Sequence, residues 1–552
     1  MSTLSFTGER QVRFPAPDVA RGFMLALIAL ANVPFWVSFF PAHPRAGFAA
    51  LDAMTSADQW WFLVRAMFVD RRAYPLFSIL FGFGMVIMAR RTIERERRAA
   101  LDPLPRELSD GWNPVQWQIF NEAVEARARR AASRLIRRRG WWMIGIGAVH
   151  SLVFSGDIIG AYGLVAVACA ELIVMRRSWP RVVVGVCIAA LSLLSLGAMA
   201  EAMGAGLMNL EYHGPSALTG TYPLTSFGSW IASTIMTPLT SLVVPCVMIG
   251  VGVARWGALQ DPRGHRGALC AIAGVGLLVG ALGASPYALG QLDWAQVWSA
   301  GGAFALYHAT GVAGACGWLA LLALVGGGPR EASAQVGEGP GQDLGAVRSF
   351  LSAIGRRSMT AYLSQTLLFV IVFLTLGLIG VESVGVAVSG LIALGVWVVI
   401  GIGCVVSDAM GAARGPAERL LRWLVARSAS TLPLPALPPA PMGPWVPMPP
   451  AGAGMPGVPL ASGTPFAPGA PSVAGVPIPA NVGAVSNVTG APMPSHAPGV
   501  PGAPLPQSVG AASNVPAASN GAVTPAAPGD PGTKWMPPAA AQADVREADS
   551  AP

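Results

Sequence analysis

The sequence predicts an all-α, polytopic helical membrane protein with about ten transmembrane helices and a disordered C-terminal tail. Of the 552 residues, 53% are hydrophobic and only 12% are charged, which is typical of integral membrane proteins rather than soluble enzymes. Apolar runs of about 20 residues, the length that crosses a bilayer as a helix, recur as far as residue 407. From about residue 430 the composition changes abruptly to proline, alanine and glycine.

The apolar runs are expected to be helices because lipid cannot satisfy the hydrogen bonds of a bare backbone. A further run at 58–70, with Trp60 and Trp61, predicts an interfacial helix before the second span. The first run leads into a full span without a small-residue cleavage site, so we expect it to remain as a helix. The predicted spans are 18–40, 73–90, 139–155, 157–175, 182–208, 226–254, 267–290, 297–325, 358–380 and 386–407.

The arginines indicate how these spans are oriented, because short cytoplasmic loops carry an excess of Lys and Arg. The loops at 209–225, 291–296 and 381–385 contain neither residue and are expected outside. We therefore expect an even number of spans with both termini cytoplasmic. The first outer loop departs from this pattern, with Arg45, Arg65, Arg71 and Arg72. The predicted inner loops contain Arg90, Arg91, Arg95, Arg97, Arg98, Arg127, Arg129, Arg130, Arg176, Arg177, Arg181, Arg255, Arg263, Arg266, Arg356 and Arg357.

The net charge of +8 does not indicate nucleic-acid binding, because the basic residues lie mostly between apolar spans. Lys534 is the only lysine, and the other basic residues are arginine, which points to a GC-rich bacterial genome. Six cysteines are scattered through apolar segments with no CxxC and no Cys/His cluster. Neither a disulfide framework nor a metal site is therefore expected.

The chain divides into a cytoplasmic N-terminus at 1–17, a transmembrane domain at 18–427 and a tail at 428–552. Within the domain, 91–138 is a basic cytoplasmic segment, expected to be partly helical. It is either a solvated orientation signal that also touches anionic lipid, or a docking surface for an anionic cofactor. The tail carries 29 of the 48 prolines, which oppose helix formation, so we expect a disordered cytoplasmic tail. A tail-binding protein and a homo-oligomer both stay open as partners, beside the lipid bilayer.

Polar residues inside spans are costly, so they are candidate functional residues. In the first span, Asp18, Arg21 and Asn32 share one helical face. Arg21 is either an inner-end anchor paired with Asp18, or it lies at the inner mouth of a cavity. In the cavity, its guanidinium would suit a phosphate or carboxylate.

The stretch HSLVFSGDIIGAY places His150 seven residues before Asp157, at the predicted turn between the third and fourth spans. Asp157 could simply cap the fourth helix by accepting its free N–H groups. His150 lies below the outer surface and must pair or face water, as a packing residue or as part of a working site.

A polar stripe follows GRR in the ninth span, where Ser358, Tyr362, Gln365 and Thr366 fall on one helical face. Such a stripe either joins helices through hydrogen bonds or lines a cavity.

The remaining candidates are His308, near the middle of the eighth span, and the sixth span, which contains Pro238 and Pro245. Prolines free backbone carbonyls, and interrupted helices recur in the ligand sites of transporters. No nucleophile elbow, P-loop or HExxH motif is present.

Several of these segments together resemble the YeiB-like family of bacterial inner-membrane proteins, also called domain-of-unknown-function family 418. The resemblance covers residues 13–427. The family's usual GDIL is GDII here, and Ala361 stands where an Asn commonly precedes the tyrosine. The matching pieces are DVARGF with Asn32, LFSILFGFG at 76–84, Arg139 followed by G-x-x-H ending at His150, GDII-x-x-Y at 156–162, GRRSMTAYL-x-Q at 355–365 and GP-x-E-x-L-x-R at 415–422.

The resemblance implies a multi-pass membrane protein that is distantly similar to membrane acyltransferases, including the heparan-glucosamine acetyltransferase type. The family has also been labelled as transporters. The first hypothesis is therefore an acyltransferase that moves an acyl group from cytosolic acyl-CoA to an envelope acceptor. No covalently bound cofactor is expected.

In this hypothesis His150 is the general base and Asp157 orients it. Arg21 and the cytoplasmic arginines would receive the donor across about 15–20 Å of depth, which a pantetheine-like arm can span. The alternative is a transporter of a small molecule, and a scaffold that uses the proline-rich tail is a third hypothesis. The candidate donor- or substrate-binding residues are Arg21, Asn32, Tyr362, Gln365 and His308.

Overall fold

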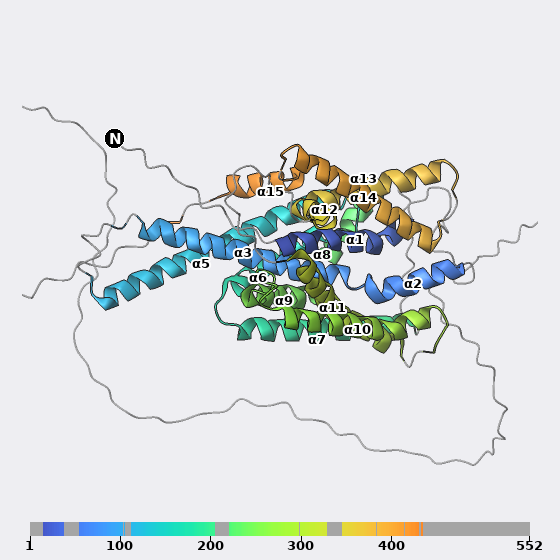
Figure 1. The fold of residues 1–552 in the computed structure, drawn as a ribbon, viewed down its shortest axis with the longest axis horizontal. Coiled ribbons are helices and arrows are strands. Elements are labelled where there is room, and N and C mark those ends of the chain that lie inside the picture. Colours follow the sequence, from blue (N-terminus) through green and yellow to red (C-terminus); the bar gives the residue numbers. More distant parts are fainter. Residues whose placement is uncertain are drawn as a thin grey trace, which may run out of the picture. The chain divides into compact units, whose positions relative to one another are not determined.

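The computed structural model describes residues 15–37, 54–102, 104, 112–204, 220–296, 299–327, 345–381, 384–412, 414–429 and 432–433 (Figure 1). Within these ranges the regular elements are helices, and no strand occurs, as the sequence predicts. Apart from its first few residues, the predicted disordered tail lies outside the described residues, as does most of the N-terminus at 1–17. The helices are α1 (Pro15–Val37), α2 (Ser56–Phe68), α3 (Ala73–Leu101), α5 (Pro114–His150), α6 (Ile159–Val174), α7 (Trp179–Gly204), α8 (Tyr222–Thr240), α9 (Val243–Trp256), α10 (Arg266–Gln291), α11 (Ala300–Gly326), α12 (Gly345–Arg356), α13 (Ser358–Leu378), α14 (Val386–Ala409) and α15 (Pro416–Arg427).

The apolar helices make this a membrane protein by length and composition. Among the described residues, seven segments are long and apolar enough to cross a bilayer, or eight if the bent pair α8 and α9 counts as one span. The two further predicted spans correspond to α6, which has 16 residues, and to the end of α5 that leads to His150. The predicted count of ten therefore includes one short helix and part of one long helix.

The basic segment predicted at 91–138 is largely helical, and it continues the neighbouring spans without a break. α3 runs to Leu101, and α5 begins at Pro114, directly after Asn113, whose side chain forms a capping box with Gln116. Arg127 pairs with Glu96 at 2.7 Å, so the two helices are joined by an ion pair. Figure 1 shows the end of α3 and the start of α5 projecting beyond the other helices, and the two helices contact each other. We call the part of α3 and α5 that lies within residues 91–138 the basic end of the bundle.

Of the arginines that depart from the positive-inside pattern, Arg65 and Arg72 are built into the junction between α2 and α3, and Arg45 lies outside the described residues. Arg72 is fully buried, and its Nη1 donates to the carbonyls of Ala66 at 2.8 Å and Asp70 at 2.6 Å. Its Nη2 donates to the carbonyl of Gly280 in α10. Arg65 pairs with Asp70 at 2.9 Å. Because Arg65 and Arg72 bind groups inside the protein, they do not act as loop charges that set orientation.

The break in the sixth span occurs where the prolines predict it. α8 contains Pro238 and ends at Thr240, α9 begins at Val243, and the two helices are bent by 59°. The hydroxyl of Ser192 in α7 donates to the carbonyls of Leu239 at 3.1 Å and Ser241 at 2.9 Å. The protein itself therefore satisfies carbonyls that the break exposes.

The N-terminus of α13 is held by a carboxylate from α15. Glu418 accepts from the backbone N–H groups of Met359 at 2.7 Å and Thr360 at 3.2 Å, and from the Thr360 hydroxyl at 2.6 Å. A carboxylate at this position satisfies free donors and complements the helix dipole. The GP-x-E motif thus fixes the start of the helix that carries the polar stripe.

The crossing of α3 and α9 depends on glycine at two positions. A Cβ at Gly82 would lie 2.2 Å from the carbonyl oxygen of Val247, and one at Gly250 would lie 2.0 Å from that of Ile79. Both obstacles are backbone atoms, so no side-chain rotation could relieve the clash. Small residues allow such close backbone approach in membrane bundles.

We expect Gly250→Ala to destabilise the protein by about 1–3 kcal/mol, because the added methyl group forces α3 and α9 apart. Thermal unfolding in detergent should show a transition several degrees lower. Gly252→Ala is the matched control, since a Cβ there meets nothing within 4 Å. Equal unfolding temperatures for the two variants would contradict the proposed crossing.

Candidate functional site

His150 and Asp157 meet at the turn between α5 and α6. His150 is the last residue of α5, and its Nδ1 lies 2.8 Å from Oδ1 of Asp157. The side chain of His150 is 8% exposed and that of Asp157 is 0% exposed. The sequence predicts this pairing from the seven-residue spacing across the turn.

Asp157 is also bound through its second oxygen. Oδ2 accepts from the backbone N–H of Gly160 at 2.9 Å and from Nε1 of Trp230 at 3.2 Å. The bond to Gly160 satisfies a free donor in the first turn of α6, which is the capping role considered above. Asp157 therefore both caps α6 and holds His150, so the two readings of this residue do not exclude each other.

A glycine in α5 makes room for this carboxylate. A Cβ at Gly147 would lie 2.6 Å from Oδ2 of Asp157 and 2.6 Å from the backbone nitrogen of Gly160. The close approach of α5 to the start of α6 thus requires a residue without a side chain at this position.

Helix α8 fixes the turn from the other side. The hydroxyl of Tyr222 donates to the carbonyl of Val153 at 2.8 Å, and that of Ser226 donates to the carbonyl of Ser151 at 2.5 Å. Trp230 lies one turn further along α8 and reaches Asp157. Three contacts at successive turns therefore hold the turn against one helix.

The second nitrogen of His150 faces the polar stripe of α13. Nε2 lies 2.9 Å from Oγ1 of Thr366, and the ring of Tyr362 packs edge-on against the imidazole with centroids 5.4 Å apart. An ionised carboxylate at Asp157 would accept the hydrogen of Nδ1, and Nε2 of a neutral His150 would then accept the hydrogen of the Thr366 hydroxyl.

Aromatic side chains cover this site. The indole of Trp36 stacks on Phe154 with centroids 5.2 Å apart and on Phe369 at 6.0 Å. Phe154 in turn packs edge-on against His150 at 5.8 Å. With His150 almost fully buried, a substrate can reach Nε2 only after some of these side chains move.

Gln365 connects α13 to α1 instead of facing His150. Its Nε2 donates to the carbonyl of Leu25 at 2.8 Å. Arg21 lies one helical turn, about 6 Å, from Leu25 along α1, and it forms the predicted ion pair with Asp18 at 3.3 Å. Neighbouring residues of α13 thus contact both His150, through Thr366, and the helix that carries Arg21, through Gln365.

Arg21 is near Arg139, which in turn is near Arg422. A Cβ at Gly84 would lie 3.3 Å from the Arg21 guanidinium, which shows that Arg21 packs against α3. Arg139 of α5 interacts electrostatically with Arg21, Arg422 and Glu418, and its buried Nε has no hydrogen-bond partner in the described residues. Guanidinium groups from α1, α5 and α15 therefore gather near the basic end.

His308 and Asn32 are not part of the contacts around His150 and Asp157. His308 is buried in α11, where its Nδ1 lies 3.3 Å from the hydroxyl of Tyr74 and its ring packs against Phe304 at 4.6 Å. Asn32 lies half-buried on α1, eleven residues after Arg21. Neither is a hydrogen-bond or ring partner of His150 or Asp157.

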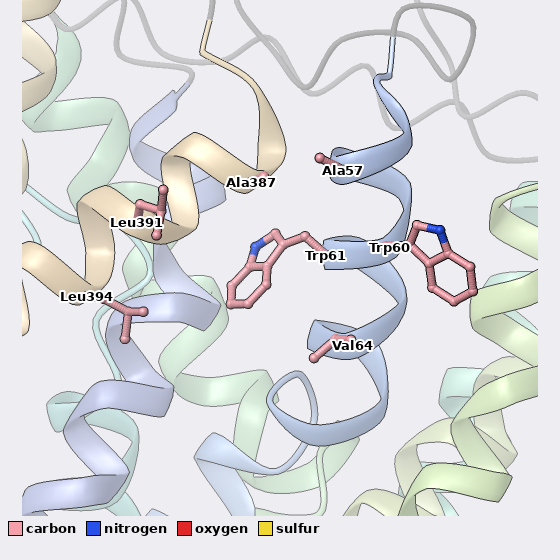
Figure 2. A pocket seen from close by; sticks show the side chains of 7 residues that line it. All are labelled: Ala57, Trp60, Trp61, Val64, Ala387, Leu391 and Leu394. Atoms are coloured by element: carbon pink, nitrogen blue, oxygen red, sulfur yellow. The ribbon is translucent and has the colours of Figure 1, made fainter.

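An apolar groove lies apart from this site, between α2 and α14, and has a volume of about 400 Å³. Figure 2 shows the Trp61 indole between the two helices, whereas Trp60 points to the opposite side of α2. The groove is lined by Ala57, Trp60, Trp61, Val64, Ala387, Leu391 and Leu394, which offer no charged group for a substrate.

Two partners of the pair were not among the predicted site residues. Trp230 is 73 residues from Asp157 in the chain, and nothing in its local sequence distinguishes it from an ordinary tryptophan in a span. Thr366 belongs to the predicted stripe, but helical periodicity alone does not say which member of the stripe meets His150.

The comparison with protein families adds to this geometry. The family described as "Protein of unknown function (DUF418)" matches residues 253–428, which include the motifs at 355–365 and 415–422. His150, Asp157 and the motifs of the first two spans lie before this range. No curated protein and no solved structure matched the chain. The match to the DUF418 model thus covers residues 253–428, and the ordered motifs of the chain resemble the same family.

Proposed function

We propose that this protein transfers an acyl group from a cytosolic CoA-type thioester to a hydroxyl or amine acceptor in the bacterial cell envelope. The observation that carries the proposal is the orientation of His150. Asp157 holds its Nδ1 at 2.8 Å, while its Nε2 faces a hydroxyl at 2.9 Å. This arrangement is suited to a general base.

The reaction follows from this geometry. The acceptor takes the place of the Thr366 hydroxyl at Nε2, and His150 removes its proton as the acceptor attacks the thioester carbonyl carbon. The buried Tyr362 hydroxyl donates no hydrogen bond within the described residues, so it can donate to the oxyanion that forms. When the C–S bond breaks, the protonated His150 returns its proton to the leaving thiolate. Asp157 stabilises the positive imidazolium between these two steps.

The donor would bind from the basic end. Its phosphates would meet Arg21, Arg139 and Arg422, which carry the charge and donors that phosphates prefer. The pantetheine arm would then pass along α13 towards His150. This direction is consistent with cytoplasmic termini and with a site buried away from the cytosol.

Transport of a small molecule has one observation in its favour. The core holds two separate polar contacts at Tyr74: its hydroxyl lies 3.3 Å from Nδ1 of His308, and its backbone carbonyl accepts from the hydroxyls of Ser78 and Tyr162. The hydroxyl of Tyr162 donates to the Tyr74 carbonyl at 3.1 Å and shares a 2.7 Å hydrogen bond with Ser78. These buried polar groups could line a substrate path, but they include neither His150 nor Asp157.

Purified protein in proteoliposomes, given labelled acetyl-CoA and candidate acceptors, separates the two functions. We expect wild type to transfer label, and His150→Gln to lower the rate by about 10²–10⁴-fold through loss of the general base. Asp157→Asn should lower it strongly as well, because an amide can hold His150 in the wrong tautomer. His265→Gln is the control, since His265 binds the Asp261 carbonyl at 2.9 Å in a distant turn. Accumulation of unmodified substrate in sealed vesicles, without transfer, would favour transport instead.

Thr366 gives a second prediction. Thr366→Ser keeps the hydroxyl and should retain activity within a few fold. Thr366→Val should remove the hydrogen bond to Nε2 of His150 while preserving the shape of the side chain. If the hydroxyl only marks the acceptor position, Thr366→Val should change KM for the acceptor more than kcat. A complete loss of kcat in Thr366→Val, with activity in Thr366→Ser, would instead make the Thr366 oxygen a nucleophile.

The donor site gives a third prediction. Arg139→Gln should raise KM for acyl-CoA by about 10- to 150-fold, because one charge-assisted hydrogen bond contributes about 1.5–3 kcal/mol. The KM for the acceptor should not change. Arg95→Gln removes an equal charge from the exposed face of α3 and serves as the control. An equal rise of KM in both variants would point to general electrostatic attraction and against a specific donor site.

A further inference from the structure

A second concave site lies on α5, where the arginine-rich part of the helix meets the apolar part. It has a volume of about 420 Å³ and is lined by Arg134, Arg137, Arg138, Trp141, Trp142 and Ser428. Neither the His150 site nor the groove between α2 and α14 shares a residue with it. The pocket is therefore separate from both sites described above.

The charges in this pocket are not balanced. Arg137 pairs with Glu171 at 3.1 Å, and this is the one ion pair made by the three arginines within the described residues. Arg138 reaches the carbonyl of Ser428 at 3.5 Å, but its buried Nε has no hydrogen-bond partner there. Arg134 is exposed. The pocket thus presents excess positive charge and free guanidinium donors, which suit a phosphate group.

The tryptophans indicate where the pocket lies relative to the bilayer. Trp141 is 61% exposed, and it follows Gly140, where α5 changes from the arginine-rich RLIRRR to the apolar WWMIGIGAV. Exposed tryptophan at such a change of polarity is typical of the headgroup level of a bilayer. A ligand held by the arginines would therefore lie beside the start of the acyl chains.

The opposite wall is the end of α15. The hydroxyl of Ser428 accepts from Nε1 of Trp142 at 3.0 Å, and Arg127 donates to the carbonyls of Leu432 and Pro433 further along α5. Ser428 thus forms the wall of the pocket that faces α5, and Leu432 and Pro433 also contact α5. This wall makes the site concave, which the arginines of α5 alone would not.

We propose that this pocket binds the phosphate of an anionic phospholipid of the cytoplasmic leaflet, with the lipid chains packed along Trp141. The charge excess selects an anionic group, and the position at the polar–apolar boundary favours a lipid over a soluble phosphate. The proposal is independent of the acyl-transfer function, since it involves none of the residues that reaction requires.

The test uses the full-length protein in detergent with phosphatidylglycerol, cardiolipin or phosphatidylcholine added. Native mass spectrometry counts retained lipids, and thermal unfolding reports stabilisation. We expect the two anionic lipids to be retained and to raise the unfolding temperature, and phosphatidylcholine to do neither. Arg134→Gln with Arg138→Gln should weaken anionic-lipid binding by about 25-fold, because each arginine near an anionic surface contributes about fivefold.

Two controls keep the proposal falsifiable. Arg95→Gln with Arg130→Gln removes the same charge from exposed positions of α3 and α5 outside the pocket and should keep lipid binding. Arg134→Gln alone changes an exposed side chain, so it reports on binding even if the double variant does not fold. Equal losses in pocket and control variants would overturn the site in favour of diffuse attraction. Equal stabilisation by inorganic phosphate or glycerol 3-phosphate would overturn the lipid assignment.

Discussion

The carboxylate of Asp157 is excluded from solvent, and the arrangement around it follows from the need to satisfy its oxygens. Its donors come from three helices: His150 from α5, Gly160 from α6 and Trp230 from α8. Removing one donor would leave part of a buried charge unpaired, which is strongly destabilising. The same requirement demands glycine at position 147. The orientation of His150 is therefore a consequence of the way that α5, α6 and α8 pack around one charge.

The sequence could predict this pair because its evidence is local. Seven residues separate His150 from Asp157 across a short turn, and polar groups inside a span must find partners. Trp230 could not be predicted, since its role depends on where α8 packs. The periodicity of α13 placed its polar residues on one face but did not say which neighbours they contact. Tyr362 and Thr366 face His150, whereas Gln365 binds α1. Periodicity defines a face, but only packing decides what that face meets.

The fold shows the same division. Hydropathy located the apolar helices and two prolines located the bend between α8 and α9. Neither signal could show that Ser192 satisfies carbonyls at that bend, because Ser192 lies in another span. Charge counting also failed to explain Arg72, which is buried and binds backbone carbonyls rather than lying in a loop. A counting rule treats all arginines alike, while the structure separates those facing water from those inside.

Helix α5 carries both the arginine-lined pocket and, at its last residue, His150. Its 37 residues form a continuous rod about 55 Å long, and its one proline lies in the first turn, where it does not kink the helix. His150 lies about 18 Å beyond Arg138 along this rod. A tilt of about 3° around the pocket would therefore displace the imidazole by about 1 Å, enough to misalign a proton transfer. The lipid composition at one membrane surface would then act mechanically on chemistry deeper in the bundle.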